Sequence, residues 1–277
     1  MTPRLNGLLL AGGKSSRMGR DKASMVVGGD GLTQARRAAD LLGKFCERRF
    51  VSLRDGQPAP EGAQDLEVLV DSPLAQGPLS GILAAFDKDP DAAWLVLACD
   101  LPFISEQVLS HLIAHRKPSD APPFLAFASS SDGLPEPLCA IYEPSARTVL
   151  KRHAERNHLC PRHIMVEERA TLLELPPSCR RALENMNTPE DIAVAKGEKQ
   201  IHIGGYGALA EERGCREETV VSSAPSAGAF LEELASHLKL SGLRGQVRIA
   251  VNDEFAQPDH PLRTGDKVVF LRPFSGG

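Results

Sequence analysis

The sequence lacks long apolar runs and a strong net charge, and each absence excludes a class of protein. The apolar run near the start, residues 8–11, is far shorter than a membrane span or the apolar segment of a secretory signal. The net charge is only -4 at pH 7, so no global basic field attracts nucleic acid or an anionic membrane. We therefore expect a cytoplasmic protein with no nucleic acid and no membrane among its partners.

The sequence also lacks paired cysteines and several familiar catalytic patterns. Its six cysteines are scattered without a Cys-x-x-Cys pair, which fits neither a disulfide framework nor a zinc knuckle. Cys160 and His163 have a ligand-like spacing, but a second pair is missing, so we expect no structural metal there. The P-loop sequence Gly-x-x-x-x-Gly-Lys-Ser/Thr is absent.

Apolar runs alternate with stretches of helical period over the first two thirds of the chain. This alternation predicts βαβ units around a mainly parallel sheet, an α/β sandwich. The expected strands are residues 5–10, 50–53, 67–70, 93–99, 124–128 and 137–142, and the expected helices are residues 32–42, 78–86, 106–115 and 144–154. Thr188 as N-cap and Pro189 after it predict the start of one more helix, which reaches about Lys196.

Small and charged residues at 197–199 interrupt this pattern, and we place a linker there. It separates a domain of residues 1–196 from one of residues 200–277. In the second part we expect strands at 200–203, 219–222, 246–251 and 267–271 and a helix at 229–238. The order ββαββ predicts a small α+β domain such as a β-grasp fold.

A glycine-rich, basic loop follows the first expected strand. Gly12 and Gly13 let the backbone approach a ligand closely, because glycine has no Cβ. Lys14, Arg17 and Lys22 add the positive charge that holding a triphosphate requires. The residues alone favour this phosphate-binding loop and a solvated glycine-rich turn equally.

Two carboxylates directly follow expected strands. Asp71 comes after the run 68–70 and Asp100 after the run 94–99, at the strand ends where open α/β sheets bind their ligands. Carboxylates at such places hold Mg²⁺ that also contacts substrate phosphates. In the alternative, each acid caps a turn, at 71–73 and 100–102.

Five segments of the sequence resemble the signature segments of a known family and follow one another in the same order. They are Leu10-Ala11-Gly12-Gly13-x-Ser15-x-Arg17-Met18-Gly19-x-Asp21-Lys22-Ala23, Gly77-Pro78-Leu79-Ser80-Gly81-Ile82, Cys99-Asp100-Leu101-Pro102-Phe103, Pro137-Leu138-Cys139-Ala140-Ile141-Tyr142 and Asn185-Met186-Asn187-Thr188-Pro189-Glu190-Asp191. Over residues 5–196 the chain resembles the MobA-like molybdenum cofactor guanylyltransferases. The resemblance implies a Rossmann-like three-layer α/β/α nucleotidyltransferase domain, which transfers GMP from GTP to the terminal phosphate of molybdenum-loaded molybdopterin and releases pyrophosphate.

The resemblance also implies roles for individual residues. The nucleotide-binding set is Leu10, Ala11, Gly12, Gly13, Lys22, Asp71 and Asp100. Asp100 is the Mg²⁺ ligand by resemblance, and we expect Arg17, Lys22 and Asp100 to stabilise the transferring and leaving phosphates. Asn185 and Asn187 match positions associated with the pterin half of the substrate.

One segment departs from the family pattern. Many relatives have an asparagine after the second strand, where this chain reads Val51-Ser52-Leu53-Arg54. Relatives that use CTP usually open with Ala-Ala-Gly and lack Gly-Pro-Leu, so the resemblance favours GTP, although spacing alone does not choose guanine over cytosine. The alternatives are a nucleotidyltransferase with another acceptor, such as a sugar phosphate, or one of the CTP-using cofactor branch, and a carrier or interaction protein whose first domain is a degenerate nucleotide binder.

A run of basic residues occupies the end of the first domain. The run consists of Lys151, Arg152, His153, Arg156, His158, Arg162 and His163. We expect these residues to form a solvated helix face. In the alternative, they guide the anionic pterin to the site.

The last residues carry a second resemblance. They read Asp259-His260-Pro261-Leu262-Arg263-x-Gly265-Asp266-Lys267-Val268-Val269-Phe270 and then Leu271-Arg272-Pro273-Phe274-Ser275-Gly276-Gly277. Residues 200–277 resemble MoaD, the small sulfur-carrier subunit of molybdopterin synthase. The resemblance implies a ubiquitin-like β-grasp domain that carries sulfur on Gly277, with a MoaE-like synthase subunit and a MoeB-like activating enzyme as partners. A frayed terminus and a ThiS-like carrier of the thiamine pathway are the alternatives.

Overall fold

The computed structural model describes residues 2–12, 22–27, 30–117, 122–185, 191–192, 197–204, 217–238 and 247–271. The chain forms two compact units, Met1–Asp191 and Ile192–Gly277. The linker predicted at 197–199 stays a prediction, and the helix predicted from Thr188 to Lys196 falls largely outside the described residues. Within the described ranges, no helix is both long enough and apolar enough to cross a membrane.

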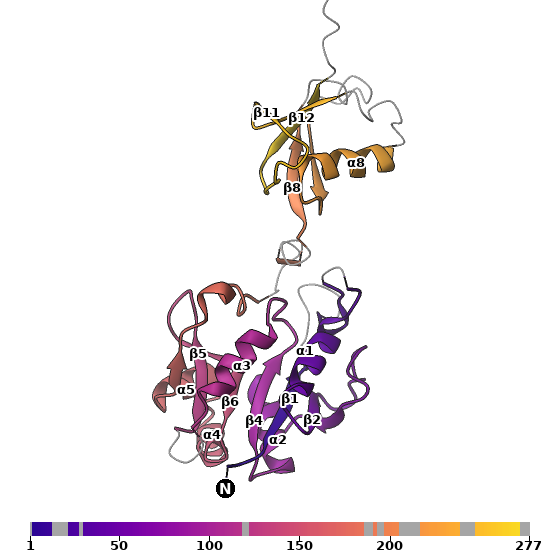
Figure 1. Cartoon of the computed structure of the whole chain (residues 1–277). Helices are drawn as coiled ribbons and strands as arrows, with labels where there is room; N and C mark the ends of the chain where they lie inside the picture. Colours follow the sequence, from indigo (N-terminus) through magenta and orange to yellow (C-terminus); the bar gives the residue numbers. More distant parts are fainter. Residues whose placement is uncertain are drawn as a thin grey trace, which may run out of the picture. The chain divides into compact units, whose positions relative to one another are not determined.

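A seven-stranded sheet forms the centre of the first unit (Figure 1). In the spatial order β3-β2-β1-β4-β6-β5-β7, it contains β1 (Leu5–Leu10), β2 (Arg49–Leu53), β3 (Glu67–Val70), β4 (Ala93–Ala98), β5 (Phe124–Ala128), β6 (Pro135–Tyr142) and β7 (Thr171–Leu173). Strand β6 is antiparallel to both of its neighbours, whereas the other pairs are parallel. The sheet is therefore mixed, because a short hairpin turn reverses the chain between β5 and β6.

Helices cover both faces of this sheet. Helices α1 (Gln34–Gly43) and α3 (Glu106–Ala114) pack on one face, and α2 (Pro78–Lys88), α4 (Ala146–Glu155) and α5 (Pro161–Glu167) pack on the other. Alternate residues of the strands enter the two cores: Leu9 of β1 packs on the first face, and its neighbours Leu8 and Leu10 pack on the second. The predicted three-layer α/β/α arrangement is confirmed. Two short 3₁₀ turns, η1 (Lys22–Ser24) and η2 (Pro177–Cys179), complete the described elements of this unit.

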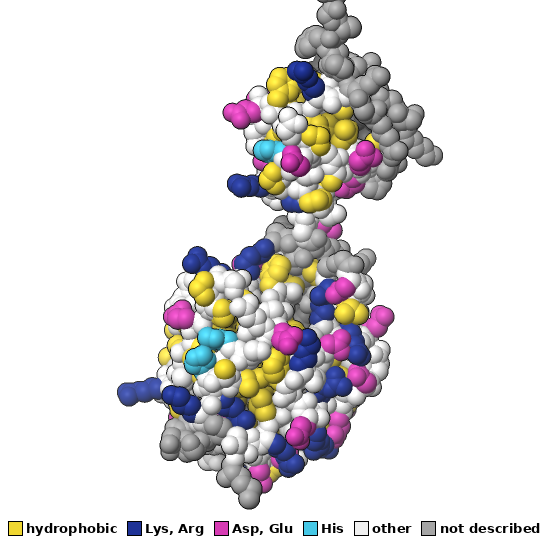
Figure 2. Space-filling view, viewed as in Figure 1, with side chains coloured by type: hydrophobic (Ala, Val, Ile, Leu, Met, Phe, Trp, Pro, Cys, Tyr) yellow, Lys and Arg dark blue, Asp and Glu magenta, His cyan; other side chains and the backbone are white. Residues whose placement is uncertain are grey.

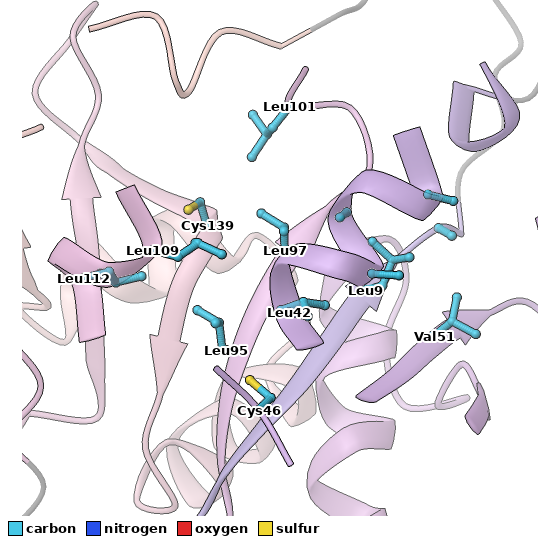
Figure 3. Close-up of a cluster of buried hydrophobic side chains, with 14 of the residues drawn as sticks. Leu9, Leu42, Cys46, Val51, Leu95, Leu97, Leu101, Leu109, Leu112 and Cys139 are labelled. Atoms are coloured by element: carbon cyan, nitrogen blue, oxygen red, sulfur yellow. The ribbon is translucent and has the colours of Figure 1, made fainter. Parts of the chain in front are cut away.

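Two of the cysteines belong to the core under α1 and α3 (Figure 3). Cys46 and Cys139 are buried there among leucines that include Leu95, Leu97 and Leu109. Burial raises the pKa of both thiols to about 12. Both thiols are therefore neutral packing groups at physiological pH.

The second unit contains a five-stranded sheet with one helix against it. The spatial order is β11-β10-β12-β8-β9, made of β8 (Lys199–Ile203), β9 (Glu218–Ser222), β10 (Arg248–Val251), β11 (Glu254–Ala256) and β12 (Lys267–Leu271). The first and last strands, β8 and β12, lie parallel in the middle, and the other pairs are antiparallel. Phe230 of helix α8 (Ala227–Leu238) packs against Phe270 in the core. This is the arrangement of a β-grasp domain, as predicted.

Charges of both signs are interleaved on the face of the first unit that Figure 2 shows. Ion pairs of the first unit include Arg36 with Asp40 at 2.8 Å and Arg48 with Glu67 at 2.8 Å. These pairs are exposed, so each contributes little to stability.

Candidate active site

Four parallel strands end at one edge of the first unit's sheet and bring distant segments together. In register, Leu10 of β1 lies opposite Ser52 of β2 and Ala98 of β4. Backbone hydrogen bonds continue the pairing past the strand ends, from Ala11 N to Ser52 O at 3.4 Å and from Asp71 N to Leu53 O at 2.9 Å. The segments after β1, β2, β3 and β4 therefore form one continuous surface.

The Asp71 carboxylate lies against the backbone of Gly12. A Cβ atom at position 12 would lie 3.4 Å from Asp71 Oδ2 and 3.7 Å from the carbonyl oxygen of Ser52. On its other side, Asp71 Oδ1 accepts a hydrogen bond of 2.5 Å from Ser52 Oγ. The turn that follows is capped by Ser72, whose Oγ accepts from Leu74 N at 3.4 Å. Asp71 therefore faces the glycine loop and does not serve as the cap of this turn.

Asp100 is a carboxylate with an unsatisfied oxygen. Its Oδ1 is inaccessible and has no hydrogen-bond partner among the described residues. Burial raises the pKa of Asp100, and the positive charge of Lys22 opposes this effect. Lys22, at the start of η1, is thus close enough to Asp100 for their charges to interact. A buried, unpaired carboxylate oxygen is a site that a hard cation such as Mg²⁺ satisfies.

Helix α2 begins at this edge and packs closely on the strands. Gly77, its N-cap, has φ 65°, and Pro78 fills the first helical position. A Cβ atom at Gly81 would lie 2.1 Å from Ser52 Oγ and 2.9 Å from Leu10 Cδ2. Only glycine fits at position 81, and the close approach of α2 holds Ser52 in place.

The side chain of Gln57 connects the loop after β2 with the end of β1. Its Nε2 donates to the carbonyl oxygen of Ala11 at 3.1 Å, and its Oε1 accepts from N and Nε of Arg54, both at 3.3 Å. Sequence reasoning missed this residue. The only local signal is the tight turn before it, where Gly56 has φ 70°.

A pocket of about 230 Å³ is lined in part by Cys99 and Leu101, the chain neighbours of Asp100, but not by Asp100 itself. It is lined by residues of the α1 region and of the segment after β4, among them Gln34, Arg37, Cys99 and Pro102. The Nε2 atom of Gln34 is buried without a described hydrogen-bond partner, as is Nε of Arg37. This recess therefore offers donors and space beside the segment that contains Asp100.

The described residues contain only part of the predicted site. The structure brings Leu10, Ala11, Gly12, Lys22, Asp71 and Asp100 to one edge of the sheet. Asn185 is exposed. Gly13, Arg17, Asn187 and Gly277 lie outside the described residues.

Comparisons with known protein families match both parts of the chain. Residues 7–171 match the model of the MobA-like NTP transferase domain, and residues 206–277 match the ThiS family.

Individual relatives agree with these matches. A molybdenum cofactor biosynthesis bifunctional protein of Synechocystis sp. is 35% identical over 187 residues, which are 68% of this chain and 52% of that protein. The chain thus spans about half the length of this relative. A probable molybdenum cofactor guanylyltransferase of Mycobacterium ulcerans is 35% identical over 142 residues, 50% of this chain and 67% of that protein. Among solved structures, molybdopterin-guanine dinucleotide biosynthesis protein A of Archaeoglobus fulgidus matches with a TM-score of 0.55 and 25% identity, covering 69% of this chain and 96% of that one.

Proposed function

This chain belongs to the family of MobA-like NTP transferases, and on that basis we propose that it transfers GMP from GTP to the terminal phosphate of molybdenum-loaded molybdopterin. One observation carries the proposal: a glycine backbone, two carboxylates and a lysine lie at one edge of the sheet. The names of the relatives from Synechocystis and Mycobacterium point to the same pathway.

The reaction needs positioning and charge neutralisation more than proton transfer. An oxygen of the acceptor phosphate attacks the α-phosphorus of GTP, and the bond from that phosphorus to the oxygen bridging to the β-phosphate breaks, so that pyrophosphate leaves. A phosphate monoester has a second pKa of about 6, so the acceptor is already largely ionised at neutral pH. No side chain is required as general base, and the chain's task is to align the two phosphates.

The residues at the sheet edge fit this task. The backbone of Ala11 and Gly12 receives the nucleotide, where the absence of a side chain at Gly12 lets the phosphates approach. Asp71, held by Ser52, binds the nucleotide from the neighbouring strand. Lys22 neutralises charge on the phosphates, and Arg17 assists it.

Asp100 is the residue that would hold Mg²⁺, because its Oδ1 is buried and has no hydrogen-bond partner in the described part of the chain. When bound there, the ion supplies positive charge to the phosphate oxygens. The positive charge of Lys22 acts on the same carboxylate and opposes the rise of its pKa by burial, which favours the ionised form that a metal ion needs.

Turnover with a panel of nucleotides tests the proposal. The full chain is incubated with Mg²⁺, molybdenum-loaded molybdopterin and GTP, CTP, ATP or UTP in turn, and the products are analysed by mass spectrometry. We expect the guanine dinucleotide and pyrophosphate from GTP alone. Equal transfer from CTP would overturn the guanine preference. A chain that leaves molybdopterin unchanged but transfers GMP to a sugar phosphate supplied in its place would overturn the proposed acceptor.

A sulfur-carrier function is the second candidate, for the C-terminal unit. It is favoured by the match of residues 206–277 to the ThiS family and by the β-grasp arrangement of the sheet. Gly277 is the residue that would be adenylated and then converted to a thiocarboxylate, with a MoeB-like enzyme as activator and a MoaE-like subunit as acceptor.

Intact-mass measurement tests this second function. After incubation with ATP, a sulfur donor and a MoeB-like activator, the chain is expected to gain the mass of one oxygen replaced by sulfur. Deletion of Gly277 serves as the control and is expected to abolish the gain without changing guanylyl transfer, since the two units have separate cores. A wild-type chain that never gains the mass with a competent MoeB-like or ThiF-like activator would contradict the carrier function.

A further inference from the structure

Two histidines and a glutamate gather where helices α4 and α5 end. His153 lies in the last turn of α4 and is 4% exposed, whereas His158 and Glu167 are exposed. One nitrogen or oxygen atom from each of the three lies within 4.8 Å of the others. The expectation that this basic run forms a solvated face is therefore wrong for His153.

The helix ends bring these side chains together. Asn157 adopts φ 60° just after α4, and the backbone N–H of His158 donates to the carbonyl oxygen of His153 at 2.9 Å. This left-handed cap reverses the chain and returns His158 to the last turn of the helix that it follows. Arg169, with φ 53°, ends α5 in the same way next to Glu167. The cluster is thus fixed by two backbone motifs.

Glu168 sets the tautomer of the His153 ring. Its Oε1 accepts from His153 Nε2 at 2.8 Å and from Arg152 Nη2 at 2.5 Å. A carboxylate paired with an arginine in this way only accepts hydrogen bonds. In the neutral ring the proton therefore lies on Nε2, and Nδ1 has a free lone pair.

The Nδ1 atom of His153 is on the side of the ring that faces Glu167. It is buried and makes no hydrogen bond with any residue that the structure describes. The nearest carboxylate oxygen, Oε2 of Glu167, is 3.7 Å away, too far for a hydrogen bond. Two ligands of a tetrahedral ion with bonds of about 2.0–2.2 Å are separated by a similar distance.

We propose that His153 Nδ1, His158 and Glu167 bind a divalent transition-metal ion of the zinc class, with water completing the coordination. Imidazole ligands select zinc, cobalt or nickel, whereas Mg²⁺ prefers oxygen ligands alone. Glu168 acts as the outer carboxylate that orients a metal-binding histidine. The ion links the end of α4 to the end of α5.

This site is separate from the proposed magnesium ligand. Helix α4 follows β6, which runs antiparallel to β4. The cluster lies at the other end of α4, but α4 and α5 pack on the face of the sheet opposite to α1 and α3. The transition-metal site uses none of the residues proposed for guanylyl transfer, and its test does not rely on turnover.

Spectroscopic titration of the full chain tests the proposal. After treatment with a chelator, the protein is titrated with Co²⁺ and its visible absorption bands are recorded; Zn²⁺ is then added to displace the cobalt. His158→Ala and Glu167→Gln alter exposed side chains and leave the core intact. His163→Ala, which alters another exposed histidine of α5, is the matched control.

We expect one saturable Co²⁺ site in the wild type and in His163→Ala, displaced by Zn²⁺, and no such site in His158→Ala or Glu167→Gln. Glu168→Gln is expected to weaken binding about 10–100-fold, the effect of losing an outer-sphere carboxylate. A wild type without saturable bands would overturn the site and leave His153 as an ion-pair partner of the two glutamates. Equal binding by His158→Ala and the wild type would overturn it as well.

Discussion

The hydrogen bond from Ser52 to Asp71 offers a direct test of how the sheet edge is held together. Ser52 is 2% exposed, and its Oγ lies 2.5 Å from Asp71 Oδ1. A hydrogen bond to a charged group contributes about 1.5–3 kcal/mol. We therefore expect Ser52→Ala to lower the free energy of unfolding of the first unit by about 1.5–3 kcal/mol.

Urea unfolding followed by tryptophan fluorescence measures this loss. Trp94 is the only tryptophan in the chain and is fully buried in β4, so its fluorescence reports the first unit alone. Ser72→Ala is the control, since Ser72 is also buried but makes only a neutral hydrogen bond of 3.4 Å within a turn. Its expected cost is smaller, about 0.5–1.5 kcal/mol.

A double-mutant cycle with Asp71→Ala separates this hydrogen bond from other effects of the substitutions. For residues in contact, we expect an interaction energy of about 0.5–3 kcal/mol between Ser52→Ala and Asp71→Ala. Strictly additive losses, or a cost of Ser52→Ala equal to that of Ser72→Ala, would refute the reasoning.

Three further variants probe the same edge. Lys22→Ala removes a charge-assisted contact with the triphosphate and is expected to weaken GTP binding about ten- to a hundredfold in calorimetry, corresponding to about 1.5–3 kcal/mol; unchanged affinity would contradict the phosphate role. Asp100→Asn is expected to raise the melting temperature of the metal-free chain. Burial raises the pKa of Asp100 in the folded chain above its value of about 3.9 in the unfolded chain. The free energy of unfolding therefore falls as the pH rises from about 3.9 through the folded-state pKa, and at pH 7 the ionised carboxylate destabilises the fold. A lower melting temperature of Asp100→Asn would argue against this effect of burial. Gly81→Ala is expected to lower the free energy of unfolding by about 1–3 kcal/mol by overpacking, since the new Cβ would lie 2.1 Å from Ser52 Oγ. The cost of Gly81→Ala is expected to be smaller when it is measured in a Ser52→Gly chain, because both proteins of that comparison lack the Ser52 side chain and its hydrogen bond to Asp71; an equal cost in both backgrounds would speak against a direct clash.

The elements that cross the core were the most predictable from the sequence. The expected bounds of β1 (Leu5–Leu10), β3 (Glu67–Val70) and β5 (Phe124–Ala128) agree with the structure, because compact apolar runs between turn residues define them. Helix α5 (Pro161–Glu167) and strand β7 (Thr171–Leu173) were missed. Both are short, so neither presents enough periods of a hydrophobic pattern to be distinguished from a loop.

Contacts between segments were less predictable than the segments themselves. Asp71 and Asp100 were recognised by their position after strands, but the partner of Asp71 depends on the pairing of β2 with β3, which brings Ser52 beside it. The bridge made by Gln57 likewise depends on where the loop after β2 returns to β1. Strand order and loop path arise from the whole fold, and local patterns do not contain them.

The burial of His153 could be predicted from helical spacing, but the basic residues around it pointed to an exposed face. Ala146, Leu150 and His153 are spaced by four and three residues, so they share one face of α4, and all three are buried. The basic residues around His153 favoured a solvated face instead. Helical periodicity was the better guide here than composition.

The magnesium dependence of guanylyl transfer tests the central claim most directly. The initial rate of transfer of labelled GMP from GTP to molybdenum-loaded molybdopterin is measured over a range of Mg²⁺ concentrations for the wild type, Asp100→Asn and Asp91→Asn. Asp91 is an exposed acid at the opposite end of β4 and serves as the control. We expect saturable Mg²⁺ dependence in the wild type and in Asp91→Asn, and its loss in Asp100→Asn. Superimposable curves for all three proteins would contradict the assignment of this sheet edge as the site of transfer.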